Sequence, residues 1–396
     1  MKAALVRAEL VWDGGFDVAI PAKIGTPCAD QMVGTTGEKL IELMTRLCYD
    51  SLGVDENMER KGRSTSATLG NVMEVYHGSV LEHYVRTVEL GRVPGATERE
   101  HLMMCFAGRP GASVRMKLGN TMLNEVSYRI TINTRAVVEW DQWSAVLLAE
   151  HGLPAHSGSA RLWACLGERL REKWSRAVPL IVKYEEKGGE WPVWLITAPF
   201  EFVEPETDSE KHITLYLVGS RGFSHEMVRH RFAMSQRSTR YCEEGASPWQ
   251  WHPLIHQFIA EHPHIPVFEA LLNQTQEVAQ TTYTAICNEL QEWLAKKLPE
   301  DTPYRKKHAR KQARGAARGF QGNALETQMG FTAPVWGWRH IANMRAADAA
   351  DAEIRVVISD AVPCLKASRY GDRFADMNLV LASDGMGWAL EGGGHK

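Results

Sequence analysis

The sequence predicts an α+β fold, in which an antiparallel sheet is combined with helices. Two segments, NEVSYRITIN at 124–133 and HITLYLVGSR at 212–221, alternate apolar and polar residues, which is typical of strands with one buried face. Strand-like and helix-like segments come in blocks along the chain, without a regular strand–helix–strand rhythm. This order favours α+β over a doubly wound parallel sheet.

The spacing of apolar residues predicts the other elements. Residues 36–50 place Leu40, Leu43, Met44 and Leu47 on one side of an amphipathic helix. We expect a strand near 84–91, strand and loop at 178–205, and a disordered Gly-rich tail at 385–396. Further helices are expected at 158–175, 266–298, 303–320, 335–345 and 348–360.

Composition argues against several classes of protein. The 396 residues carry a net charge of −3, whereas nucleic-acid-binding proteins usually show a basic excess. The seven scattered cysteines contain no CxxC pair, so we expect a reduced, cytoplasmic chain without a zinc ribbon or disulfide framework. No apolar run is long enough to predict a membrane span, and we expect no signal peptide.

Residues 224–244, SHEMVRHRFAMSQRSTRYCEE, concentrate four arginines, two histidines and several hydroxyl groups. Such donors suit phosphate oxygens. Successive helical residues point about 100° apart, so Arg229, His230 and Arg231 cannot all share one solvated face while the same helix buries Met227. At least one should face an anionic or planar ligand. The alternative is a solvated basic turn that pairs with the acidic residues at 243–244.

A metal site is not expected in this stretch. His225, Glu226 and His230 resemble the zinc motif HExxH, but the second histidine comes one residue late. Five residues rotate a helical side chain by roughly 140°, so the two imidazoles would not share an ion.

Arg345 falls on one helical face with Trp338 and Ile341. An arginine on an apolar stripe needs a partner and is either a salt-bridged core residue or a ligand clamp. Asp348, Asp351 and Glu353 are the nearby acids that could pair with it.

Two further features allow two interpretations each. Lys306, Arg310, Arg314 and Arg318 step by four along a predicted helix, which indicates either a solvated face or a stripe that faces phosphate or nucleic acid. Cys242 is either a reactive thiolate beside cations or a bystander thiol.

The stretch RHRFAMSQRSTRY (229–241) resembles the signature of the flavin-dependent thymidylate synthases. Other blocks similar to that family follow in the family's order: RLCYDS (46–51), HGSVLEH (77–83), GSRGFSHEMVRHR (219–231), and a C-terminal series. That series comprises Ala317-Arg318, Thr327, Thr332, Arg345, Ala350 and Glu353-Ile354. The resemblance covers roughly residues 36–90 and 212–360, and several ordered blocks are more specific than one motif.

The resemblance implies one catalytic domain over residues 1–396, with a core at about 34–90 and 211–365 and an insertion at about 91–210. It also implies a homotetramer that binds FAD and converts dUMP to dTMP with NADPH and methylenetetrahydrofolate. Carried over by position, the FAD-binding residues would be His83, Arg229, His230 and Arg231. The dUMP-binding residues would be Glu226, Gln236, Ser238, Arg240, Arg318 and Arg345.

Within this family-based interpretation, Arg345 would be the catalytic residue, stabilising negative charge that develops on the uracil ring. The phosphate would meet Ser238, Arg240 and Arg318. No cysteine nucleophile is implied, so we expect Cys242 to be dispensable.

The sequence also departs from the family pattern. The signature is one residue short between Arg231 and Ser238, Gln321-Gly322 replaces a Leu-Pro pair, and Pro334-Val335-Trp336 replaces an N-x-R element that supplies flavin-side donors. Asn133 and Arg135 are candidates for replacement donors.

The departures leave alternatives open. One is a related flavin- and folate-dependent enzyme with a different one-carbon product, such as a hydroxymethyl group. Another is a nucleic-acid-binding protein that uses the stripe at 306–318. A gene carried by a bacterial virus is one origin consistent with the sequence.

Overall fold

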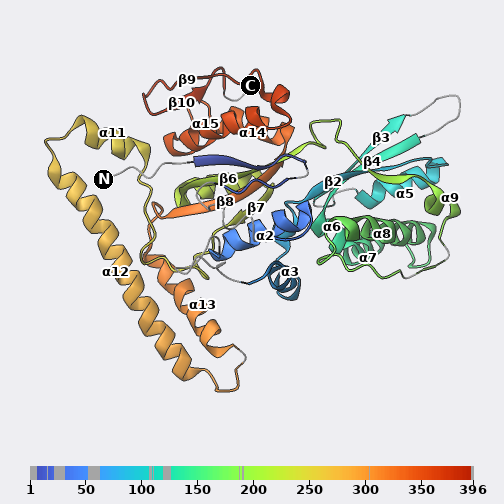
Figure 1. Ribbon diagram of the computed structural model, residues 1–396, viewed down its shortest axis with the longest axis horizontal. Coiled ribbons are helices and arrows are strands. Elements are labelled where there is room, and N and C mark those ends of the chain that lie inside the picture. Colours follow the sequence, from blue (N-terminus) through green and yellow to red (C-terminus); the bar gives the residue numbers. More distant parts are fainter. Residues whose placement is uncertain are drawn as a thin grey trace. The chain divides into compact units, whose positions relative to one another are not determined.

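The computed structural model describes residues 7–393, apart from 16, 22–31, 52–62, 107–108, 110, 119–125, 187, 190 and 303. The chain forms two compact units. Unit 1 comprises Met1–Val11, Arg46–Leu52 and Ile213–Lys396, and unit 2 comprises Trp12–Thr45 and Gly53–His212. Helices and antiparallel strands are mixed in both units (Figure 1), which confirms the predicted α+β class.

Unit 1 is built on a four-stranded sheet with the order β1-β6-β8-β7. The strands are β1 (Arg7–Trp12), β6 (His212–Ser220), β8 (Glu326–Pro334) and β7 (Ala233–Gln236). β7 pairs antiparallel with β8, with Ala233 opposite Thr332 and Gln236 opposite Met329. This register joins the middle of the Arg-rich stretch, residues 224–244, to strand β8.

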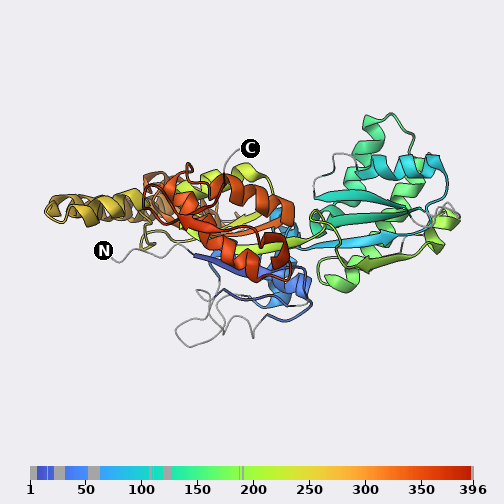
Figure 2. The same cartoon turned by 90° about the horizontal axis from the view of Figure 1, so that it is seen from above.

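Helices α14 (Val335–Arg345) and α15 (Ala352–Ala367) lie across this sheet, as the orange and red ribbons show in Figures 1 and 2. Trp338 of α14 is fully buried, and its indole Nε1 donates to the carbonyl of Ile213 over 2.9 Å. Burying a large apolar side chain contributes roughly 1.5–3 kcal/mol. This packing therefore fixes α14, and with it Arg345 at its last position.

The other elements of unit 1 are α10 (Arg221–Met227), η2 (Val228–His230), α11 (Pro253–Glu261), α12 (Pro266–Lys297), α13 (Arg305–Ala317), η3 (Arg318–Phe320) and η4 (Gly371–Phe374). Of these, α12 and α13 match the helices predicted at 266–298 and 303–320, whereas α11 and η4 were not predicted. Ala309, Ala313 and Ala317 of α13 are buried, and the last two pack against Tyr283 and Cys287 of α12. Because these alanines recur every four residues, they line one side of α13 and leave its arginines on another.

Unit 2 contains a second antiparallel sheet, with the order β3-β4-β2-β5. Its strands are β3 (Ala112–Leu118), β4 (Val126–Asn133), β2 (Val85–Leu90) and β5 (Phe200–Val203). Its helices are α3 (Thr65–Glu74), α4 (Gly78–Leu81), α5 (Ala96–Phe106), α6 (Thr134–Val138), α7 (Trp140–Glu150), α8 (Gly158–Ala177) and α9 (Val193–Thr197). Helix α2 (Thr36–Tyr49) begins in unit 2 and its last four residues belong to unit 1.

Several details differ from the sequence-based expectations. Strands β1, β7 and β8 were not predicted, and α15 was expected at 348–360 but spans Ala352–Ala367. β4 was expected to be half-buried, but its polar side is also buried because Arg129 on that side is enclosed by carboxylates. The tail was expected to be disordered from residue 385, but Trp388–Leu390 forms β10, which pairs with β9 (Leu379–Leu381). Residues 394–396 lie outside the described part of the chain.

The boundaries of the units also bear on organisation. Residues 63–90 belong to the same unit as residues 91–210, in which the insertion is expected. The single catalytic domain with its core and insertion therefore stays a prediction. Among the described helices, none is both long and apolar enough to cross a membrane.

Candidate active site

Helix α10 follows strand β6 directly and leads into the Arg-rich stretch, residues 224–244. Ser220 is the N-cap residue of this helix. Its hydroxyl accepts a hydrogen bond from the backbone N–H of Phe223 over 3.1 Å, which is a helix N-cap. Its own N–H donates to the Glu353 carboxylate over 3.0 Å. These contacts fix the start of α10 and so direct Glu226 and the turn that follows.

The change from η2 to β7 takes place at Arg231, whose backbone is left-handed with φ 44° and ψ 33°. A left-handed conformation costs a residue with a side chain roughly 1–2 kcal/mol. β7 begins two residues later, at Ala233. The shortened part of the signature, between Arg231 and Ser238, thus begins at this tight reversal.

Arg345 of α14 meets Glu226 and His230 from the Arg-rich stretch. Its Nη1 donates to Glu226 Oε2 over 2.6 Å, and its Nε donates to His230 Nε2 over 3.0 Å. The Arg345 side chain keeps 17% of its surface exposed, and in the described part of the chain its Nη2 has no hydrogen-bond partner. The cluster therefore leaves one guanidinium amine available to a ligand.

His230 is neutral in this arrangement. Burial, the Arg345 guanidinium and His340 lower the pKa of His230 to about 4. The neutral ring can accept the Arg345 N–H at Nε2, which places its proton on Nδ1. His340 packs edge-on against it, with 6.0 Å between ring centroids.

The acids expected to pair with Arg345 have other roles. Asp351 accepts from the N–H of Glu353 at the start of α15 and faces His252, while Glu353 accepts from Ser220. Asp348 accepts from the N–H of Ser383 over 2.7 Å. The predicted partners are thus wrong, because Glu226, which is distant in sequence, reaches Arg345 through the fold.

Gln236 lies at the end of β7 and is held by two hydroxyls. Its Nε2 donates to Ser224 Oγ over 2.8 Å and to Thr327 Oγ1 over 3.1 Å. These contacts fix the direction of the amide. Sequence reasoning assigned no role to Ser224 and Thr327, although Thr327 belongs to the C-terminal series of family-like blocks.

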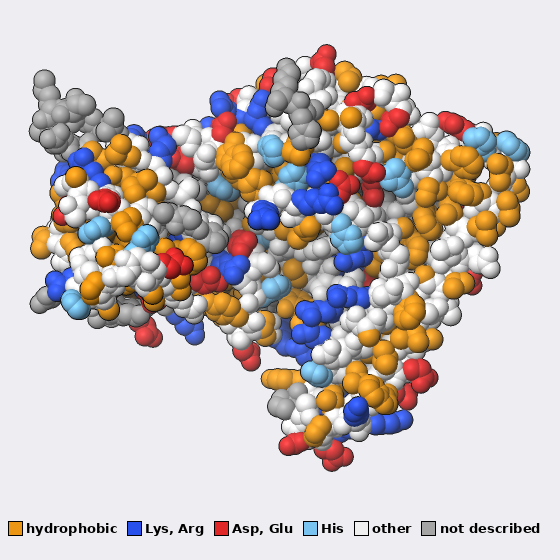
Figure 3. Space-filling model, turned by 180° about the vertical axis from the view of Figure 1, so that it is seen from behind, with side chains coloured by type: hydrophobic (Ala, Val, Ile, Leu, Met, Phe, Trp, Pro, Cys, Tyr) orange, Lys and Arg blue, Asp and Glu red, His pale blue; other side chains and the backbone are white. Residues whose placement is uncertain are grey.

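The expected phosphate donors follow on exposed turns. Ser238 is anchored by its N–H to the carbonyl of Cys48 over 3.0 Å, and its hydroxyl accepts from the N–H of Arg240 over 3.4 Å. The side chains of Arg240 and Arg318 are exposed. Figure 3 shows Lys and Arg side chains gathered over the region of α13, from which Arg318 follows directly.

Arg237 differs from the other arginines of the stretch. It is buried, donates to Glu244, and reaches Asp50 Oδ2 over 3.1 Å. These carboxylates raise the pKa of the Arg237 guanidinium against its burial. Arg237 is therefore a structural residue. It pairs with acidic residues, as the alternative interpretation of the stretch predicted, but it is buried and does not lie on a solvated turn.

The basic stripe of α13 is interrupted by an ion pair. Arg314 donates to the carbonyl of Tyr241 and to Glu243 Oε2, the latter over 2.9 Å. One of its four cations is therefore neutralised, which weakens the nucleic-acid interpretation.

The remaining expected residues lie in unit 2. His83 is fully buried, and burial lowers its pKa to about 3. Asn133 caps α6 by accepting from the N–H of Ala136 over 2.8 Å, and Arg135 pairs with Glu82 and Glu139. Asn133 and Arg135 are therefore engaged within unit 2, which does not favour them as replacement donors.

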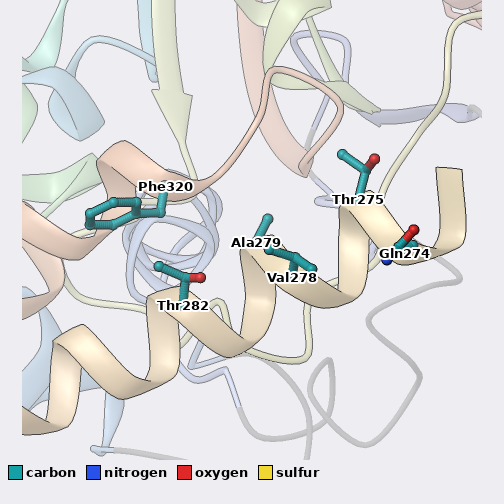
Figure 4. A pocket seen from close by; sticks show the side chains of 6 residues that line it. All are labelled: Gln274, Thr275, Val278, Ala279, Thr282 and Phe320. Atoms are coloured by element: carbon teal, nitrogen blue, oxygen red, sulfur yellow. The ribbon is translucent and has the colours of Figure 1, made fainter. Parts of the chain in front are cut away.

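A separate pocket with a cavity volume of about 420 Å³ runs along α12. Figure 4 shows its lining: Gln274, Thr275, Val278, Ala279 and Thr282 of α12, and Phe320 of η3. None of the expected site residues lines it.

The site thus combines a guanidinium clamp, a neutral imidazole, an oriented amide and exposed cations, which suit an anionic, planar ligand. Residues 210–368 match the family model described as "Thymidylate synthase complementing protein". The resemblance to flavin-dependent thymidylate synthases, predicted from the motifs, is therefore confirmed.

Curated relatives carry the name flavin-dependent thymidylate synthase. The protein of Mycobacteroides abscessus is 34% identical over 176 residues, and that of Corynebacterium efficiens is 35% identical over 176 residues. Each alignment covers 43% of this chain and 64% of the relative. The protein of Mycobacterium tuberculosis is 35% identical over 177 residues. The alignments thus span somewhat less than two thirds of the relatives' length.

Among solved structures, the UMP/dUMP methylase PolB from Streptomyces cacaoi, bound with 5-Br dUMP, is 14% identical. The match covers 67% of this chain and 96% of that chain, with a TM-score of 0.30.

Proposed function

We propose that this chain is a flavin-dependent enzyme that adds a one-carbon unit to carbon 5 of dUMP, with dTMP as the product. NADPH and methylenetetrahydrofolate are the proposed co-substrates. The observation that carries the proposal is the Arg345–Glu226–His230 cluster, which unites two of the family-like blocks in one place. Its free Arg345 amine suits negative charge that develops on a uracil ring.

His230 of this cluster and its two neighbours in sequence have side chains whose chemistry suits a flavin. Arg229 and Arg231 are exposed and can donate to an anionic cofactor, and His230 offers a neutral ring. When bound, FAD would supply the redox chemistry of the reaction. Arg229, His230 and Arg231 would bind and orient it.

The dUMP-binding residues divide by the part of the nucleotide they suit. Ser238, Arg240 and Arg318 offer a hydroxyl and guanidinium groups to the phosphate. Gln236 offers an amide with a fixed direction, which can exchange hydrogen bonds with the imide edge of uracil. Glu226 holds the Arg345 guanidinium in place.

The test is flavin binding followed by turnover. The purified protein should bind FAD with a yellow absorption that NADPH bleaches, and it should release a methylated product from dUMP. A protein that binds no added FAD and does not oxidise NADPH would refute the proposal. We further propose a homotetramer located in the cytoplasm, and the mass in solution tests the assembly.

A second product is favoured by one observation. Pro334, Val335 and Trp336 stand where the family pattern has N-x-R, so the hydrogen-bond donors on the flavin side differ. The mass of the product made from dUMP separates the methyl from the hydroxymethyl compound.

A further inference from the structure

Trp336 exposes its ring on the helix that carries Arg345. The side chain keeps 48% of its surface exposed on the first turn of α14. Phe232 supports it edge-on, with 5.4 Å between ring centroids and an interplanar angle of 69°. A Cβ atom at Gly337 would lie 2.7 Å from Phe232 Cζ, so a larger residue at 337 would displace the Phe232 ring. The indole is thus held on one side and left accessible elsewhere.

The exposed side of α14 continues from Trp336 to the cluster. His340 follows by four residues, so the two side chains are neighbours on the helix surface. His340 is exposed and packs edge-on against His230, which accepts from Arg345. The rings of Trp336, His340 and His230 therefore form a strip that leads to the Arg345 guanidinium.

Cations flank one end of this strip. Arg229 and Arg231 adjoin His230 in sequence, and both side chains are exposed. Among the described residues, no carboxylate forms an ion pair with either of them. A strip of aromatic rings beside unpaired guanidinium groups suits a planar aromatic ring that carries an anionic tail.

We propose that Trp336 is a cofactor-binding residue that stacks on the isoalloxazine ring of the flavin. The proposal rests on the proposed function. We assign the isoalloxazine ring, and not another part of FAD, to Trp336 because the strip leads to Arg345, where the uracil ring is expected. In place of the missing N-x-R donors, a ring contact would then supply the affinity.

Binding of riboflavin, FAD and ADP to the full chain tests the assignment, since riboflavin carries only the ring and ADP only the anionic half. Trp336→Ala should weaken riboflavin and FAD binding by the same factor, roughly 5- to 150-fold for the loss of one stacked ring. ADP binding should be unchanged. Trp293→Ala is the matched control, because that tryptophan is 52% exposed on α12.

A second variant protects against a folding artefact. Trp336→Phe keeps an aromatic ring and should retain most of the riboflavin affinity, while the bound flavin regains fluorescence that the indole quenches. Unchanged riboflavin affinity in Trp336→Ala would overturn the inference, as would a selective loss of ADP binding. A change in the mass in solution with flavin affinity intact would assign Trp336 to a protein contact instead. If the wild-type chain binds no flavin at all, the proposed function itself fails.

Discussion

Arg129 in unit 2 and Arg345 in unit 1 both form ion pairs with glutamate, but their hydrogen bonding differs. Arg129 is 2% exposed, and each of its nitrogens donates to a carboxylate: Nε and Nη2 to Glu210, and Nη1 to Glu89 and Glu206. Arg345 uses Nε and Nη1 only and leaves Nη2 for a ligand. The comparison suggests a criterion: an arginine whose nitrogens all donate within the protein is structural, whereas one with an unused N–H donor can still bind a ligand.

The largest expected effect comes from Arg129→Ala. The change leaves Glu210 buried without its main partner, and breaking a buried pair in this way typically costs about 3–5 kcal/mol of the free energy of unfolding. Denaturant titration measures it. Lys296→Ala, in an exposed pair with Glu292, is the control and should change little. Equal stability of both variants would contradict the structural assignment of Arg129.

Arg345→Ala should show the reverse pattern. We expect dUMP-dependent turnover to fall by about 10²- to 10³-fold, the usual loss when a donor to developing charge is removed, while flavin binding persists. Arg345→Lys should not restore the rate, since an ammonium cannot reproduce the fork to Glu226 and His230. Near-normal turnover in Arg345→Ala, measured at saturating dUMP, would refute its assigned role.

Arg318→Ala sharpens the comparison for an exposed cation. Loss of one charge-assisted hydrogen bond to phosphate should weaken dUMP binding by roughly 10- to 100-fold, with little change in stability. Calorimetric titration with dUMP measures the affinity. Arg310→Ala, also exposed and on α13, is the control. An equal loss of dUMP affinity in that variant would mean that the overall positive charge, and not a direct contact of Arg318, attracts the phosphate.

The pH dependence tests His230. Its pKa of about 4 lies below the ordinary 6.5, so between these values the unfolded chain binds more protons than the folded one. The stability that this group contributes is complete above pH 6.5 and is lost as pH falls through 4. His230→Gln, whose amide oxygen can accept from Arg345, should reduce the loss of stability between pH 7 and 5 by about 1 kcal/mol.

Denaturant titration at the two pH values measures this difference. His264→Gln, at an exposed histidine, is the control for the loss of a histidine that is not buried. The same pH dependence in the wild type and in His230→Gln would show that other histidines account for it.

Cys242→Ala should have the smallest effect on function. The thiol is buried, and burial raises its pKa to about 12, so it stays protonated and is a poor nucleophile. Turnover and flavin binding should be unchanged. Loss of turnover with the fold and flavin intact would mean that the thiol takes part in the chemistry.

Local patterns predicted several elements, because helical and strand periodicity is set by neighbouring residues, but they did not predict strands β1, β7 and β8. Helices α2 and α14 and strand β6 lie within about two residues of the expected ranges. The sequence also predicted that Arg345 lies on the packed face of its helix. Its true partner was not, because Glu226 lies 119 residues away and only the fold brings them together.

The same limit explains the other differences. The polar side of β4 looked solvent-facing, yet residues 204–210 supply the carboxylates that cover Arg129. Arg237 looked like one more phosphate donor, but Asp50 and Glu244 enclose it. In each case a distant or looping segment decides whether a charge is a ligand donor or part of the structure.

The left-handed backbone of Arg231 sets two requirements against each other. Glycine adopts such a conformation without steric cost, so Arg231→Gly should relieve roughly 1 kcal/mol of strain while it deletes a guanidinium proposed to bind the flavin. A variant selected only for heat resistance would therefore tend to lose the cofactor. Resistance to unfolding and occupancy by flavin should move in opposite directions at this one position.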